Sequence, residues 1–119
     1  MTGTPITIGR IVHYTLTADD ATLINRRRAE HAHAASSRRY DPQDPAYDPA
    51  MIPAASGNVS HVGNHAEAGQ VYPATVVRVF EGERFTANLQ VHLDGNDTHW
   101  VTSIQEGERP GAWAWPPRV

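Results

Sequence analysis

Apolar and polar residues alternate along the last third of the chain. Leu89, Val91 and Leu93 are apolar with a polar residue between each pair, and this period of two is typical of a strand with one buried face. Asp94-Gly95 follows directly and is expected to supply the positive φ of a tight turn. The pattern therefore predicts a β-hairpin over residues 86–105.

A second pattern, with the signals of a helix, lies near the start of the chain. Thr17-Ala18-Asp19-Asp20 has the form of a capping box with Asp in place of Glu, and its two carboxylates suit the positive end of a helix dipole. A helix is expected to start at Ala18 and to run to about residue 35. Because its apolar residues are confined to the first two turns, its far half should project into solvent or against a partner.

The remaining apolar runs predict strands. The first of them is expected to place Ile8, Val12, Tyr14 and Leu16 on one face. The run at 71–80 is apolar on both faces, which indicates a central strand. The full set of expected strands is 8–16, 71–80, 86–93, 99–105 and 112–115.

Residues 36–70 separate the helix from the rest of the sheet and lack a regular pattern. Three Asp-Pro pairs, at 41–42, 44–45 and 48–49, each disfavour helix at the residue before the proline. We expect one domain, residues 1–119, with an irregular arm at 36–70 and a β-core at 71–117. The expected fold is α+β, mainly β: a small five-stranded antiparallel barrel or SH3-like sheet, with one inserted helix and a long Pro-rich loop.

Composition narrows the class of protein. The chain of 119 residues has no cysteine and is 39% hydrophobic, so a thiolate zinc site and a disulfide framework are excluded and the core must be small. Oligomerisation would help such a chain, and a homo-oligomer is expected. Its apolar runs are too short for a membrane span and its start lacks the pattern of a signal peptide, which favours a cytoplasmic protein without membrane partners.

The charge is uneven along the chain. All ten basic residues are arginine, and residues 1–40 carry six of them with three acids, whereas residues 41–119 carry four with ten acids. A GC-rich genome is one explanation for arginine without lysine, but each guanidinium also suits phosphate or carboxylate. The net charge of −3 is against a duplex nucleic-acid binder, which usually has a strongly basic surface.

Several stretches together resemble a family of small proteins of actinobacterial phages and prophages. The most specific are Gly95-Asn96-Asp97-Thr98-His99-Trp100 and the ending Gly111-Ala112-Trp113-Ala114-Trp115-Pro116; further stretches are 8–14, 24–28 and 63–64. The family usually ends in Gly-Thr-Trp-His-Trp-Pro, so Ala112 and Ala114 depart from its pattern, and a catalytic histidine there is unsupported. The family has no established activity, so the resemblance implies a phage accessory protein, in counter-defence or in the virion.

The candidate ligand residues combine guanidinium groups, indoles and a polar turn. Arg26, Arg27 and Arg28 are suited to bind a diphosphate, or alternatively form a solvated helix face. A base would stack on Trp100 or Trp113, although at least one of the three tryptophans is expected in the core. Asn96 and Asp97 would read ribose hydroxyls or an adenine edge, or else serve only the turn.

Histidine does not provide a recognisable catalytic or metal site. His31 and His33 fall on nearly opposite sides of the helix, and His61 and His65 have no third ligand at a diagnostic spacing. No nucleophile elbow, Walker or dinucleotide fingerprint is present, so neither a metal nor another cofactor is expected.

Three function classes follow from these features. The first hypothesis is a phage protein that sequesters a small nucleotide of bacterial immune signalling, such as a cyclic ADP-ribose isomer or a cyclic oligonucleotide. The second is a virion decoration or head-completion protein. The third is a cyclic-nucleotide hydrolase with His13, His92 or His99 as general base.

Overall fold

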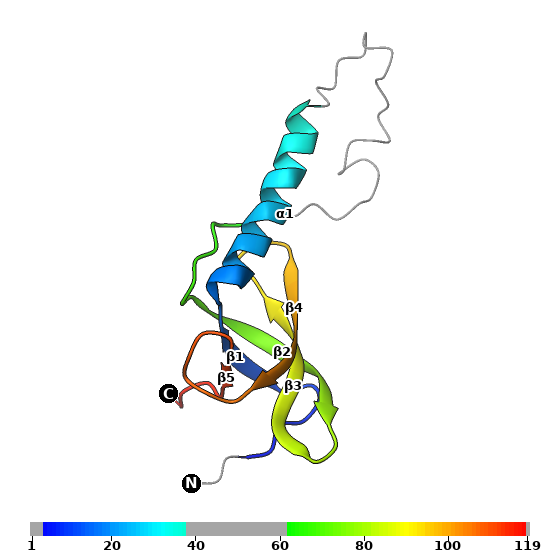
Figure 1. Ribbon diagram of the computed structural model, residues 1–119, viewed down its shortest axis with the longest axis vertical. Coiled ribbons are helices and arrows are strands. Elements are labelled where there is room, and N and C mark those ends of the chain that lie inside the picture. Colours follow the sequence, from blue (N-terminus) through cyan, green and yellow to red (C-terminus); the bar gives the residue numbers. More distant parts are fainter. Residues whose placement is uncertain (1–3, 38–61, 119) are drawn as a thin grey trace.

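The computed structural model describes residues 4–37 and 62–118, except for the side chains of residues 31–37. Within these ranges five antiparallel strands form one sheet, which curls into a half-barrel with a helix at one end (Figure 1). The predicted α+β, mainly β fold is therefore confirmed. The elements are β1 (Ile11–Thr15), α1 (Ala18–Ser37), β2 (Val71–Phe80), β3 (Glu83–His92), β4 (Thr98–Gln105) and β5 (Trp113–Ala114).

The sheet has the order β4-β3-β2-β1-β5, so β2 is central, as its apolar pattern predicted. Its curl brings the end of β4 back to β5. Glu106 and Trp113 form a parallel bridge, and the Gly107 N–H donates to the Trp113 carbonyl at 2.9 Å. The indole N–H of Trp113 donates to the Phe85 carbonyl of β3 at 2.9 Å. Trp113 thus ties β5 to β3 and to the end of β4.

The core lies on the inner face of this sheet. Leu89, Val91 and Leu93 are buried, as their spacing predicted, whereas Gln90 and His92 between them face the outer side of the sheet. Asn88 is the exception, because it is buried beside Leu89 at a register shift in the pairing of β3 with β4. Its side-chain oxygen accepts the Ser103 N–H at 2.8 Å, which satisfies the polar group in this bulge.

The first strand, predicted over residues 8–16, is shorter than predicted. The prediction that Ile8 lies on its inner face is wrong. Ile8 is 66% exposed, whereas Val12 and Leu16 are buried. The chain turns before β1 at Gly9, whose φ is +89°, and this turn ends the alternation. Ile6 is buried instead and joins the core from before the turn.

The helix starts at Ala18, as the capping box predicted. The Asp20 N–H donates to the Thr17 hydroxyl and the Thr17 N–H donates to the Asp20 carboxylate, both at 3.0 Å. Ala21 and Ile24 bury the first turns against the sheet. The second half of α1 extends beyond the sheet (Figure 1), consistent with the lack of apolar residues there.

Only the two ends of the predicted arm, 36–70, belong to the described part of the chain, and residues 36–37 complete α1, which is two residues longer than predicted. The Asp-Pro pairs lie in residues 38–61, outside the described residues. From Val62 the chain passes along α1 and enters β2, and Asn25 of α1 holds Ala66 through two hydrogen bonds. Its amide donates to the Ala66 carbonyl at 2.7 Å and accepts the Ala66 N–H at 3.0 Å.

Candidate functional site

Two of the predicted ligand residues bind each other. The Arg28 guanidinium donates through Nη2 to Asp97 Oδ1 at 2.9 Å and through Nε to Asp97 Oδ2 at 3.1 Å. Their side chains are only 10% and 1% exposed. Arg28 Nη1 also donates to the Asn64 carbonyl. This pair fixes α1 to the turn before β4.

The turn before β4 packs against the end of the arm. Gly63 and Gly95 form an antiparallel bridge, and the Asn64 N–H donates to the Asp94 carbonyl at 2.8 Å. The prediction that Gly95 has a positive φ is wrong. Glycine is required at this position because there is no space for a side chain. A Cβ there would lie 2.7 Å from the Gly63 Cα and still closer to the Val62 carbonyl oxygen.

Asn96, another predicted ligand residue, takes part in the same contact. Its side-chain oxygen accepts the Val62 N–H at 2.9 Å, and its own N–H donates to the Val62 carbonyl at 2.9 Å. Arg28, Asn96 and Asp97, all predicted ligand residues, are therefore brought together at the contact of α1, the end of the arm and the turn before β4. In this structure they hold the polypeptide rather than an open ligand pocket.

A buried hydrogen-bond network of Tyr14, Asp20 and His99 lies under the start of α1. Asp20 accepts from the Tyr14 hydroxyl at 2.5 Å, and its other oxygen lies 2.9 Å from Nε2 of His99. Burial disfavours the charge on Asp20, but hydrogen bonds from His99, Tyr14 and Thr17 outweigh it and hold its pKa well below the usual range. Burial, the hydrogen bond to Asp20 and its charge raise the pKa of Tyr14 above its ordinary value.

The hydrogen-bonded Asp20 and His99 resemble a catalytic acid–base pair, but they lie between the helix and the sheet. Asp20 and His99 are both buried, so a substrate has no path to His99 in this conformation. His92, another predicted base, is exposed on β3 and lies 2.7 Å from the Thr75 hydroxyl. His13 is half-buried on the outer side of β1. The three histidines do not converge on one site.

The outer side of the sheet carries an exposed indole. Trp100 of β4 is 60% exposed and stands opposite Gln90 of β3, while Thr98 stands opposite His92. Because side chains alternate along a strand and Val101 is buried, these four residues share the outer face. We call them the Trp100 face; it combines one large ring with an amide, an imidazole and a hydroxyl.

Arg27 lies at the edge of the Trp100 face. Its Nη2 donates to the Thr98 carbonyl at 3.4 Å, and its Nε is buried without an acceptor among the described residues. β4 is an edge strand, so the guanidinium lies where the sheet ends. Arg26 is exposed on the adjacent side of the helix. Of the predicted residues, Arg26, Arg27 and Trp100 thus remain accessible.

Trp113 is a core residue. It is fully buried, which confirms that at least one tryptophan serves the core. Its ring meets that of Trp115 edge to face, with 5.4 Å between centroids. With no exposed ring face in this structure, Trp113 cannot stack a ligand base, so the geometry gives its predicted binding role no support.

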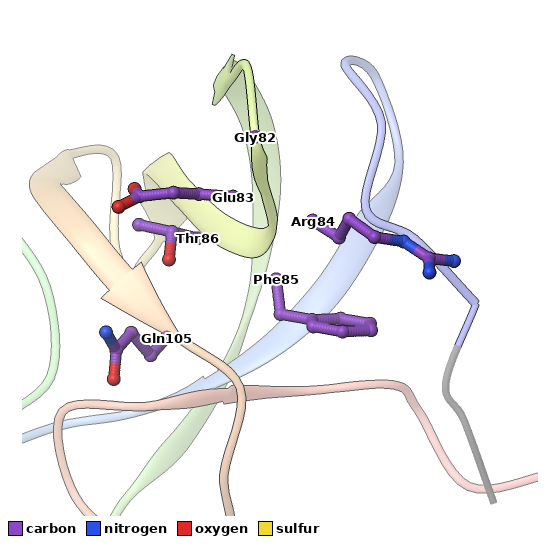
Figure 2. Close-up of a pocket in the computed structure, with 6 residues that line it drawn as sticks. All are labelled: Gly82, Glu83, Arg84, Phe85, Thr86 and Gln105. Carbon is purple, nitrogen blue, oxygen red and sulfur yellow. The ribbon is translucent and has the colours of Figure 1, made fainter.

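Two pockets lined by described residues lie away from the predicted ligand residues. The first, of about 440 Å³, is at the β2–β3 turn, where Figure 2 shows Glu83, Thr86 and Gln105 on one side and Arg84 and Phe85 on the other. It mixes a carboxylate with a guanidinium that lies over the Phe85 ring at 5.6 Å. This lining does not concentrate charge of either sign.

The second pocket is larger, about 660 Å³, and is built from the two ends of the described chain. Arg10, Trp115 and Arg118 supply its polar chemistry. Sequence reasoning missed all three as ligand residues. The available signals were Arg10 within an otherwise apolar strand, and the Trp-x-Trp spacing that puts Trp113 and Trp115 on one side of the chain.

The described residues contain no group of three or more histidines and carboxylates placed to hold a metal ion. They also contain no helix with both the length and the apolar character needed to cross a membrane. The chain matches no protein-family model, no curated protein and no solved structure.

Proposed function

We propose that this chain is a binding protein without turnover, and that its ligand is a small nucleotide second messenger of bacterial immunity. In this role it is a phage accessory protein of the host cytosol that sequesters a cyclic ADP-ribose isomer or a cyclic oligonucleotide. The observation that carries the proposal is the exposed indole of Trp100 on the face bordered by Arg27. Stacking of a base on an exposed indole contributes about 1–3 kcal/mol to the binding free energy, and a guanidinium binds phosphate oxygens through two hydrogen bonds.

The geometry divides the predicted ligand residues into two roles. In the proposed complex Arg26 and Arg27 contact phosphates, while Gln90 and Thr98, which lie on the same face as Trp100, bond a base edge or a ribose. The Arg28–Asp97 pair acts indirectly, because it fixes the turn that leads into β4, the strand that carries Trp100.

A sheet face alone encloses little of a ligand. Small-molecule sites usually bury most of the ligand in a concave pocket, whereas the Trp100 face is an outer surface. We therefore propose that two copies of the chain enclose the nucleotide between them. Such a site would require the homo-oligomer expected from the small core.

Incubation of the purified full chain with candidate cyclic nucleotides tests the proposal. The mixture is filtered, the retained protein is heat-denatured, and the released compound is analysed by mass spectrometry. Release of one intact nucleotide is the expected result. Release of a cleaved product would instead establish a hydrolase, and no retention of any candidate would contradict nucleotide binding.

Matched variants locate the site. Trp100→Ala and Arg27→Ala should each reduce retention about tenfold or more, whereas Trp100→Phe keeps a stacking ring and should retain most binding. Arg84→Ala is the control, since Arg84 is an exposed arginine at the β2–β3 turn. If Trp100→Ala and Arg27→Ala proteins deplete the nucleotide like the Arg84→Ala protein, the site is elsewhere.

One observation favours the virion alternative. Ile11, Val71 and Val77 are exposed apolar residues on β1 and β2, and their positions alternate with buried ones, so they face outward. Such residues suit a packing surface in a decoration or head-completion protein. Mass spectrometry of purified virions separates the alternatives, because a sequestering protein is expected in the infected cell and a structural one in the particle.

A further inference from the structure

Positive charge gathers in the pocket formed by the two ends of the described chain. Its lining is made by residues of the N-terminal segment, the start of β1 and the segment after β5, and among the described residues it contains two guanidinium groups and no carboxylate. The whole chain nevertheless has a net charge of −3. A concave site of one sign attracts ligands of the other sign. The lining residues are Thr4, Arg10, Ile11, Trp115, Pro116 and Arg118.

Arg10 is positioned by an aromatic stack. Its guanidinium lies over the Trp115 ring, 4.8 Å from the centroid, and Trp115 packs edge to face on the buried Trp113. Among the described residues, neither the Arg10 nor the Arg118 guanidinium has an ion-pair or hydrogen-bond partner. The donors of Arg10 are therefore held in place by the core and are not used within it.

Trp115 adds an aromatic ring to this lining. Its indole N–H is buried and has no acceptor among the described residues. Because this N–H is itself removed from solvent, it is a sensor of changes in its surroundings rather than a donor open to a ligand. The guanidinium groups of Arg10 and Arg118, both exposed residues, are therefore the charged donors that this pocket offers to a ligand.

We propose that this pocket binds a small molecule that carries a phosphate group. Arg10 and Arg118 would each grip phosphate oxygens through the two-bond geometry of a guanidinium. Because about 660 Å³ exceeds the space that a phosphate alone needs, the organic part of the ligand has room beside Ile11 and Pro116. This site is separate from the Trp100 face, which lies near α1, and it does not depend on the proposed function.

The indole N–H signals of the full chain in ¹H–¹⁵N spectra test the proposal. Inorganic phosphate, glucose 6-phosphate and AMP are titrated at constant ionic strength, with sodium chloride as the ionic control, and a Trp115→Phe protein assigns the Trp115 signal. A saturable shift of that signal with phosphate compounds, and not with chloride, is expected. Tighter binding of one organic phosphate would identify which organic part the pocket accepts.

Arginine variants separate site binding from general charge. Arg10→Ala and Arg118→Ala should each weaken binding about tenfold or more. Arg10→Lys should also weaken binding, because an ammonium group lacks the two parallel N–H donors of a guanidinium. Arg84→Ala is the matched control, since Arg84 also lies over an aromatic ring, that of Phe85. Arg118 has no such ring contact among those observed, so its variant tests the site even if Arg10→Ala perturbs the fold.

Three results would overturn the proposal: no saturable shift of Trp115, an equal shift with chloride, or variants at Arg10 and Arg118 that bind like Arg84→Ala. The Trp100 signal in the same AMP titration reports on the nucleotide site proposed above. Since Trp100→Ala should leave the Trp115 shift unchanged, failure of one proposal is distinguishable from failure of the other.

Discussion

Arg28 and Asp97 are 69 positions apart in the chain, yet they form a two-bond ion pair that is almost wholly removed from solvent. Arg28 comes from α1 and Asp97 from the turn before β4. The bridge between Gly63 and Gly95 lies directly against the guanidinium, close enough that a Cβ on Gly63 would lie 2.5 Å from Arg28 Nη2. Three separate segments of the chain therefore meet at one charge pair.

Removing the charge of Arg28 should strongly destabilise the protein. In an Arg28→Met protein the buried Asp97 carboxylate loses its two charged bonds, and breaking a buried pair in this way costs about 3–5 kcal/mol. Urea unfolding measures the change in free energy. Arg26→Met is the control, because Arg26 is exposed on the same helix and should change stability by about 0.5 kcal/mol or less. Equal effects of the two substitutions would contradict the structural role of the pair.

Gly95→Ala should destabilise through a steric clash rather than through backbone strain. Its Cβ would meet the Val62 carbonyl oxygen and the Gly63 Cα, which are backbone atoms with little freedom to move. We expect a loss of roughly 2 kcal/mol in thermal or urea unfolding, within the range of about 1–3 kcal/mol for overpacking. Glu67→Ala, an exposed substitution in the segment that Gly95 contacts, should have little effect.

Thr17→Ala should lower stability by about 1 kcal/mol, because it removes the hydroxyl that caps α1. Thr17→Ser keeps the hydroxyl and should restore most of the loss. Thr22 provides the control, since its hydroxyl bonds the Ala18 carbonyl on the exposed side of the helix and caps nothing. Circular dichroism during urea unfolding measures all three variants. A Thr22→Ala effect as large as that of Thr17→Ala would argue against a specific cap.

Features that depend on neighbouring residues could be predicted from the sequence. The capping box, a motif of four consecutive residues, identifies the start of α1. The alternation around Leu89 and Val91 identifies the inner face of β3. The exchange of Ile6 for Ile8 in the core was missed because a turn at Gly9 interrupts the alternation there. The bulge that buries Asn88 depends on Ser103 in another strand, so the alternation of β3 alone cannot reveal it.

The candidate site shows the same division. The sequence named Arg28 and Asp97 as residues of one ligand site, but it could not reveal that they neutralise each other, because that depends on the distance between α1 and the turn before β4. Exposure of an indole also depends on the curl of the sheet, which buries Trp113 and leaves Trp100 outside. The pocket of Arg10 and Arg118 is lined by residues from both ends of the described chain, and no spacing in the sequence reveals that they share one pocket.

The buried carboxylate of Asp20 should make stability depend on acid pH. Its pKa in the folded chain lies well below that of a free aspartate, about 4. Its contribution is therefore fully present above about pH 4, and it is lost as the pH falls because the unfolded chain takes up the proton first. Between about pH 5 and pH 2, unfolding free energy should fall less steeply for Asp20→Asn than for the unchanged protein. Asp19→Asn controls for loss of one negative charge in the same helical turn, and a slope unchanged by Asp20→Asn would contradict the assignment.

The indoles of Trp113 and Trp100 should respond in opposite ways to the same substitution. Trp113 is fully buried and its N–H bonds the Phe85 carbonyl, so Trp113→Ala leaves a large cavity and should cost about 3–5 kcal/mol. Trp100 is mainly exposed, so Trp100→Ala should change stability by about 0.5 kcal/mol or less. Acrylamide quenching of single-tryptophan proteins, with phenylalanine at the other two positions, should reach Trp100 readily and Trp113 poorly. If Trp100→Ala proves as destabilising as Trp113→Ala, then Trp100 is needed for the fold, and loss of ligand binding in that variant would no longer locate a site. A stable Trp100→Ala protein with unchanged unfolding makes the binding experiment a direct test of the exposed ring.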